Sequence, residues 1–219
     1  QITAIDLSLS SLTYAQRKLN EIGIDNVELI QMDIMKVALL DMKFDIIESS
    51  GVLHHMNNPS KGLKILLDSL KDNGFLKLGL YSELARKDII EARHYIANKK
   101  LQANEENIRK FRETVLFGEK ARFNSLINSL DFYSLSSCRD LCFHSQEHRF
   151  TINQLREDLK SHKLEFLGFL LPKQVKSLYK QYFPEDKKQI NLQNWEKFEE
   201  KYSNIFKAMY QFWVSKTID

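Results

Sequence analysis

The sequence FDIIESSGVLHHMNNP, residues 44–59, carries the strongest structural signal in the chain. It opens with an apolar run around Ile46 and Ile47, which predicts a buried β-strand. Small residues and a glycine follow, and two adjacent histidines come directly after them. Because open parallel sheets bind their ligands at the carboxyl ends of the strands, these polar side chains are candidates for a functional site.

Strand and helix patterns alternate on both sides of this stretch, as in a parallel, doubly wound sheet. A β-branched run from residue 2 ends at Asp6, and Ser8 can cap a helix that closes at Gly23. Asn73 and Gly74 are predicted to turn the chain between a helix and a strand. The strands are expected at residues 2–6, 27–31, 44–49 and 75–81, and the later helix at residues 60–71.

After residue 81 roughly seventy residues lack a convincing strand, which is longer than a simple crossover needs. Helical periodicity predicts an insertion of about residues 83–150 lying over the strand ends, with helices at 83–101, 104–117 and 120–130. Thr151 is expected to cap a further helix that leads into a strand ended by Pro172, and residues 191–213 are expected to form one long amphipathic helix. We therefore divide the chain into a core, residues 1–171, and a C-terminal helical extension packing on it, residues 172–219.

Three stretches together resemble the class I S-adenosylmethionine-dependent methyltransferases. ITAIDLS (residues 2–8) is similar to the second strand of the family with its acidic end, VELIQMDI (27–34) to the third strand with its Asp, and GVLHHMNNP (51–59) to the loop after the fourth strand. The first strand of the family and its glycine-rich cofactor loop would precede residue 2, so the chain looks truncated at its N-terminus. The resemblance implies an α/β, Rossmann-like, mostly parallel sheet that is incomplete at the N-terminus, with a helical insertion and a C-terminal helix.

The resemblance also implies S-adenosylmethionine as cofactor and S-adenosylhomocysteine as product. Asp6, followed by Leu7, would accept hydrogen bonds from the ribose hydroxyls, a role that suits a carboxylate with two acceptor oxygens. Asp33 would receive the adenine amino group, and Ile34 would donate its backbone N–H to the ring. Each Asp has the alternative role of capping the turn that follows it. Three small residues complete the expected cofactor site: Ser49, Ser50 and Gly51.

On the acceptor side, His55 is the candidate base, and His54 and Tyr81 are candidates to line the site. Methyl transfer needs mainly alignment of the acceptor, so a base is required only when the acceptor is a weak nucleophile. The alternative for both histidines is a packing role, and an aromatic residue at a strand end also packs more often than it binds.

The segment SSCRDLCFHSQEHRFT, residues 136–151, adds acceptor-side candidates. Methyltransferases similar to this chain, some of them fused to tetratricopeptide repeats, carry a comparable segment after a helical insertion. The same segment contains four side chains of the types that bind zinc, but their compressed spacing differs from that of structural zinc sites, so no metal is expected. The acceptor-side candidates are Glu147, His148 and Arg149, and the rejected zinc ligands are Cys138, Cys142, His144 and His148.

Two other functions compete with methyl transfer. A nicotinamide-dependent dehydrogenase would use a Tyr-x3-Lys pair, which occurs at Tyr14 with Lys18 and at Tyr95 with Lys99, in both cases without the accompanying motifs of that family. A methyltransferase-like module without activity would use the insertion or the aromatic tail for docking. The truncation favours weak cofactor binding by this chain, so the second alternative stays open.

Composition narrows the class of protein and its partners. The chain has 219 residues, 43% of them hydrophobic, and a formal charge of only +3, which argues against a nucleic-acid partner. The chain has no run of about 18 apolar residues, so no membrane span is predicted. Two cysteines are too few for a disulfide framework, so a cytoplasmic location is the default. The expected partners are an unidentified methyl acceptor and, in the full-length protein, an upstream repeat domain.

Overall fold

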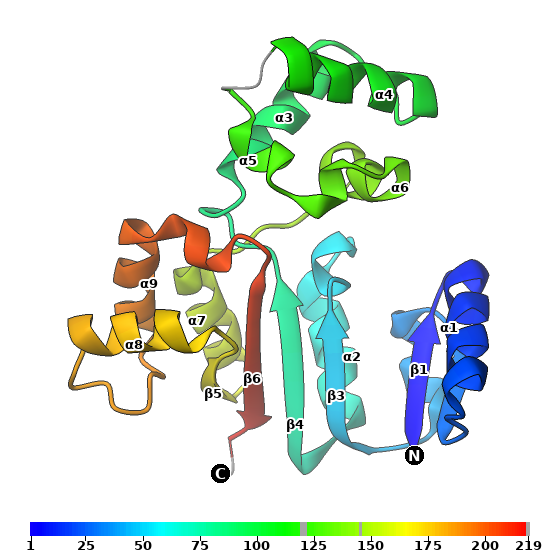
Figure 1. Ribbon diagram of the computed structural model, residues 1–219. Coiled ribbons are helices and arrows are strands. Elements are labelled where there is room, and N and C mark those ends of the chain that lie inside the picture. Colours follow the sequence, from blue (N-terminus) through cyan, green and yellow to red (C-terminus); the bar gives the residue numbers. More distant parts are fainter. Residues whose placement is uncertain (119–121, 145, 218–219) are drawn as a thin grey trace.

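The computed structural model describes residues 1–118, 122–144 and 146–217 as an α/β fold with a helical insertion above the strand tips (Figure 1). The predicted fold class is confirmed. None of the helices in these ranges is both long enough and apolar enough to span a bilayer.

The first βα unit forms as the sequence predicts. Strand β1 (Ile2–Asp6) pairs in parallel with β2 (Val27–Gln31), and α1 (Leu9–Ile22) connects them. The Ser8 hydroxyl accepts the Ser11 N–H at 3.2 Å and so caps α1, while Gly23 ends the helix with a φ of 71°, which glycine adopts without strain. A short 3-10 helix, η1 (Ile34–Leu40), follows β2.

Four strands form the main sheet, in the order β3-β4-β6-β5. The β3 and β4 strands are parallel and connected through α2, whereas β6 is antiparallel to both of its neighbours. Figure 1 shows β1 and β3 pointing the same way, although they belong to separate sheets. The bounds are β3 (Phe44–Ser50), the 3-10 turn η2 (Leu53–His55), α2 (Pro59–Ser69), β4 (Leu70–Leu80), β5 (Leu164–Phe169) and β6 (Tyr210–Lys216).

Close approach between β3 and β4 requires a glycine at position 79. A Cβ atom there would lie 2.7 Å from the Met209 sulfur and 2.9 Å from the Ser50 Cα.

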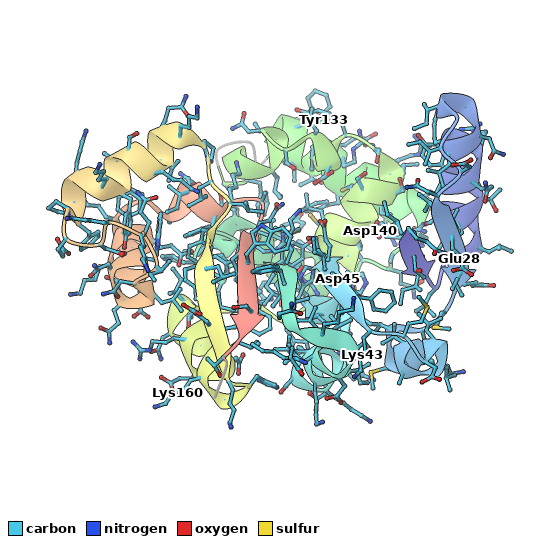
Figure 2. The ribbon with its side chains drawn as sticks, turned by 90° about the horizontal axis from the view of Figure 1, so that it is seen from below. Glu28, Lys43, Asp45, Tyr133, Asp140 and Lys160 are labelled. Atoms are coloured by element: carbon cyan, nitrogen blue, oxygen red, sulfur yellow. The ribbon has the colours of Figure 1, made fainter. Side chains whose placement is uncertain are left out.

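The turn predicted at Asn73 and Gly74 does not separate a helix from a strand, because both residues are part of β4. Around them the pairing of β3 with β4 shifts from Phe44–Leu70 to Ile46–Phe75. Lys43 and Asp45, labelled in the view from below, lie where β3 begins (Figure 2). The two histidines follow the other end of this strand.

The prediction of one long helix over residues 191–213 is wrong beyond residue 201. Helix α9 (Leu192–Lys201) ends there, η6 (Ser203–Phe206) follows, and β6 then enters the sheet between β4 and β5. The alternate residues Tyr210, Phe212 and Val214 are all buried. Pairing with two strands satisfies the backbone of β6, so sheet formation overrides the helical spacing of the same aromatic residues.

The insertion consists of short helices around its own core, above the tips of the main sheet (Figure 1). The predicted helix 83–101 is shorter than expected, whereas the predicted helix 104–117 forms as an α-helix continued by a π-helical turn. Part of the predicted helix 120–130 lies outside the described residues. Cys138 and Cys142 are buried in this core. Its elements are α3 (Lys87–Asn98), α4 (Glu105–Glu113), η3 (Thr114–Gly118), α5 (Asn124–Ile127), η4 (Leu130–Phe132), α6 (Leu135–Cys138) and η5 (Arg139–Phe143).

Three helices accompany β5 and β6: α7 (Ile152–Ser161), α8 (Lys173–Tyr182) and α9. The Thr151 cap of α7 is confirmed, because its hydroxyl accepts the Gln154 N–H while the Gln154 side chain accepts the Thr151 N–H. The main core contains the fully buried Trp195 of α9. Residues after 171 therefore pack on the core and also contribute a strand to its sheet.

Candidate functional site

Two predicted carboxylates lie at the carboxyl ends of β1 and β2. Asp6 is exposed, and its Oδ1 accepts the Ser8 N–H at 2.7 Å. Within the described residues its second oxygen has no protein donor, so one acceptor faces outward. Asp33 caps η1 by accepting the Met35 N–H at 2.8 Å. Each Asp therefore fills its capping role and keeps an oxygen for a further partner.

The two strand ends are tied together by hydrogen bonds. The Gln31 side-chain amide donates to the Leu7 carbonyl at 3.1 Å, and the Met32 N–H donates to the Asp6 carbonyl at 3.1 Å. Ile34 stands at the first position of η1, where a backbone N–H has no acceptor within its own helix. These contacts bring the cofactor-side candidates of β1 and β2 to one edge.

The small residues at the end of β3 provide polar groups and space. Ser49 is buried, and its hydroxyl has no hydrogen-bond partner in the part of the chain that the structure describes. Gly51 has a φ of 80°, and no atom lies within 4 Å of the place where its Cβ would be. The predicted cofactor-side residues thus form two groups, one on the β1–β2 sheet and one at the tip of β3.

His54 is fully buried at the tip of the main sheet. Its ring stacks on Tyr81 with centroids 3.7 Å apart, and within the described ranges neither ring nitrogen makes a hydrogen bond of good geometry, although the Gly79 backbone favours the protonated ring. Burial lowers the pKa of His54 to about 3, with the positive charges of protonated His55 and of Arg86 acting in the same direction. His54 is therefore neutral at physiological pH.

His55 is half-buried and has a defined partner on one side. Its Nδ1 lies 3.0 Å from the Gln146 carbonyl, which can only accept, so Nδ1 carries the proton and Nε2 carries the lone pair. Burial lowers the pKa of His55 as well. A neutral imidazole with Nε2 as its acceptor is the form that a general base requires.

The end of the insertion, after η5, joins these residues. The His148 N–H donates to the His54 carbonyl at 2.7 Å, and the Phe150 N–H donates to the Tyr81 carbonyl at 2.9 Å. Arg149 is partly exposed, with its Nη1 3.6 Å from a Glu147 oxygen. The structure thus brings the predicted acceptor-side candidates together at the ends of β3 and β4, although the Glu147 side chain is buried.

Several residues of this cluster were not predicted from the sequence. Arg86 and Arg93 both bind Glu147, and the rings of His144 and His55 have centroids 4.1 Å apart. Arg86 is the N-cap of α3, and Arg93 follows seven residues later, about two helical turns, so that both can lie on one side of the helix. This spacing was available in the sequence. Gln146 lies in the quoted segment 136–151 but was not singled out there.

The alternative sites do not form at the strand ends. In the ranges that the structure describes, no three His, Cys, Asp or Glu side chains are grouped so that they could hold a metal ion. Tyr14 and Lys18 lie on α1, and Tyr95 and Lys99 lie at the insertion helix α3. Neither Tyr–Lys pair lies at the carboxyl ends of the strands, where the two histidines and the two aspartates are.

Residues 1–78 match a protein-family model described as a methyltransferase domain. PKMT2 from Rickettsia typhi, solved in complex with AdoHcy, superimposes on 98% of the chain with a TM-score of 0.70 at 16% identity. This chain therefore carries the fold of that protein, and its first 78 residues are similar to the methyltransferase domain. The resemblance seen in the sequence and the Rossmann-like fold are confirmed.

Two curated relatives of this methyltransferase-fold chain also match in sequence. An uncharacterized protein of Synechococcus sp. is 32% identical over 77% of the chain, and malonyl-[acyl-carrier protein] O-methyltransferase of Acetivibrio thermocellus is 29% identical over 48%. The chain spans 42% of the first relative, 36% of the second and 44% of the solved Rickettsia chain. Each match therefore covers less than half of the related protein.

Proposed function

We propose that this chain is part of an S-adenosylmethionine-dependent methyltransferase that methylates an acceptor not yet identified. One observation carries the proposal. The carboxyl ends of β1, β2 and β3 present Asp6, Asp33 and the Ser49–Gly51 turn, the residues that the family resemblance assigns to the cofactor. The AdoHcy bound to the Rickettsia typhi protein supports the choice of cofactor.

The residues present fit this cofactor. The outward oxygen of Asp6 can accept from ribose hydroxyls, and Asp33 with the Ile34 N–H can meet the adenine edge. The buried Ser49 hydroxyl without a protein partner and the open space at Gly51 suit the methionine part of the ligand. Because these groups stand on two separate sheets, the chain by itself is expected to bind the cofactor weakly.

The protein would contribute alignment and one proton acceptor. When bound, S-adenosylmethionine supplies the electrophilic methyl group. His55 Nε2 would accept the proton of the acceptor, and the Gln146 carbonyl would keep its ring oriented for this transfer. Tyr81, His54, His148 and Arg149 are proposed to shape the acceptor side.

Asp6→Asn is expected to weaken S-adenosylhomocysteine binding by about tenfold to a hundredfold, because hydrogen bonds to a charged group contribute more than neutral ones. In the variant, the asparagine side-chain oxygen can still accept the Ser8 N–H. The NH2 group of the same side chain then faces the ribose and presents a donor where the carboxylate presented an acceptor. Calorimetric titration of this chain and of the full-length protein measures the effect. Asp25→Asn, in the exposed turn before β2, is the matched control. Equal affinities of Asp6→Asn and the wild type would remove Asp6 from the site.

A second candidate function is a methyltransferase-like docking module. It is favoured by large apolar side chains on the main sheet, Ile46 at 59% exposed and Phe75 at 46%. These two residues face each other across β3 and β4. A well-folded full-length protein that binds neither S-adenosylmethionine nor S-adenosylhomocysteine would exclude the enzyme and favour the module. The cytoplasmic location and the upstream repeat domain stay predictions.

A further inference from the structure

Glu147 is a buried carboxylate that three arginines surround. Its side chain is 0% exposed, and Arg86 binds it with two hydrogen bonds, Nε to Oε1 at 3.1 Å and Nη2 to Oε2 at 2.8 Å. Arg93 donates to Oε2 at 3.1 Å from the insertion helix α3. A carboxylate so enclosed is not free to meet a substrate, but it fixes the guanidinium groups that bind it.

The first of these arginines holds His54 in place. The Arg86 guanidinium carbon lies 3.6 Å from the Tyr81 ring centroid, and that ring also stacks on His54, with centroids 3.7 Å apart and the planes at 26°. Arg86 is almost fully buried, a setting in which a cation over an aromatic face is most favourable. The chain of contacts Glu147, Arg86, Tyr81, His54 therefore connects the carboxylate with the first histidine.

The second arginine holds His55 in place. Arg93 Nη2 donates to the His144 carbonyl at 2.6 Å, and the His144 ring lies 4.1 Å from the His55 ring, centroid to centroid. His55 Nδ1 also lies 3.0 Å from the carbonyl of Gln146, the residue before Glu147. The position of Glu147 therefore influences His55 in two ways, through Arg93 with His144 and through the carbonyl of the neighbouring Gln146.

We propose that Glu147 is a positioning residue, which through Arg86 fixes Tyr81 with His54 and through Arg93 fixes His55 for the methyl acceptor. This inference rests on the proposed function, because it assigns the acceptor side to these rings. It also gives the insertion a role in the site. Because Arg93 belongs to α3, a displacement of α3 displaces His55.

Glu147→Gln tests this role without knowledge of the acceptor. The amide keeps the shape of the side chain but removes the charge and one acceptor site. We expect the rings of His54 and His55 to react with diethyl pyrocarbonate about tenfold faster than in the wild type, because local opening becomes easier. Peptide mass spectrometry gives the rate at each histidine, and ring NMR signals give their environment. Glu91→Gln is the matched control, because Glu91 lies on α3 with Arg93 and its exposed ion pair with Arg122 is outside the cluster.

Arg93→Gln separates a positioning role from general loosening. Arg93 is at the edge of the cluster, and besides Glu147 it contacts the His144 carbonyl on the His55 side. Arg86 keeps both of its bonds to Glu147 when Arg93 is replaced, so the loss of Arg93 should accelerate modification of His55 much more than that of His54. This variant also tests the positioning role if Glu147→Gln fails to fold. Unchanged reactivity and ring signals of His55 in Arg93→Gln overturn the proposal, as does equal acceleration at both histidines.

Binding of S-adenosylhomocysteine to the full-length protein is measured on the same variants. The wild-type protein is expected to bind it, and the variants are expected to keep that affinity, since Glu147 is not among the cofactor-side residues. Failure of the wild type to bind refutes the proposed function, whereas the histidine reactivities alone refute the positioning role. The two failures are therefore distinguishable.

Discussion

Replacing Trp195 with alanine is expected to lower the free energy of unfolding by about 4 kcal/mol. The side chain is fully buried and stacks on Tyr179 with ring centroids 3.7 Å apart, while Phe169 and Phe198 meet it edge-on. Its indole N–H donates to the Gln189 carbonyl at 2.9 Å. Alanine would leave a large cavity and a carbonyl without its donor, and both effects destabilise the native state.

Urea denaturation followed by circular dichroism measures this loss. Trp213 on β6 is the second of the two tryptophans and remains as a fluorescent reporter. Trp195→Phe should fall between wild type and Trp195→Ala because it keeps most of the ring contacts. Phe117→Ala, at a side chain 85% exposed, should change the free energy of unfolding by less than about 0.5 kcal/mol. A Trp195→Ala midpoint equal to that of the wild type would contradict the prediction.

The effect of this substitution should reach the functional site through α9. Glu199, one turn after Trp195, is buried and accepts hydrogen bonds from the Ser82 and Tyr210 hydroxyls, each at 2.6 Å. Burial raises the pKa of the Glu199 carboxyl. Because Ser82 directly follows Tyr81, a displaced α9 would disturb the tip of β4.

The order of strands and helices up to residue 81 could be predicted because each element there carries a local signal. Ser8, Gly23 and Thr151 terminate helices through contacts within a few residues of themselves. The tail is different, since Met209 and Phe212 suit a helical spacing while Tyr210, Phe212 and Val214 suit a strand. Only the pairing of β6 with β4 and β5, which are distant in sequence, selects the strand.

The candidate site shows the same division between local and distant information. Asp6 and Asp33 end strands, and their capping bonds are local, so a sequence motif is enough to place them. Glu147 was predicted to face the acceptor, but its partners Arg86 and Arg93 are 61 and 54 residues away in the chain. The sequence motif gives the position of Glu147 in its segment, whereas its burial depends on how the insertion folds back.

Acidification is expected to destabilise the protein through His54, by on the order of 4 kcal/mol between pH 6.5 and about 3. Burial holds the pKa of His54 at about 3 in the folded protein, against 6.5 for an ordinary histidine. Between these values the unfolded chain binds a proton that the native protein does not, so stability is complete above pH 6.5 and is lost as the pH falls toward 3. Protonation in the native state would place a buried cation beside Tyr81, near the positively charged Arg86 guanidinium.

His54→Phe isolates this contribution because phenylalanine keeps a ring on Tyr81 and cannot titrate. At pH 7 the variant should be as stable as the wild type or more stable, since two buried nitrogens without partners among the described residues are removed. Its free energy of unfolding should then decline less than that of the wild type from pH 6.5 downward, in urea titrations at matched pH values. His94→Gln, at an exposed position on α3, should follow the wild-type curve. Parallel curves for His54→Phe and the wild type would show that His54 titrates normally, and therefore that its ring is reached by water.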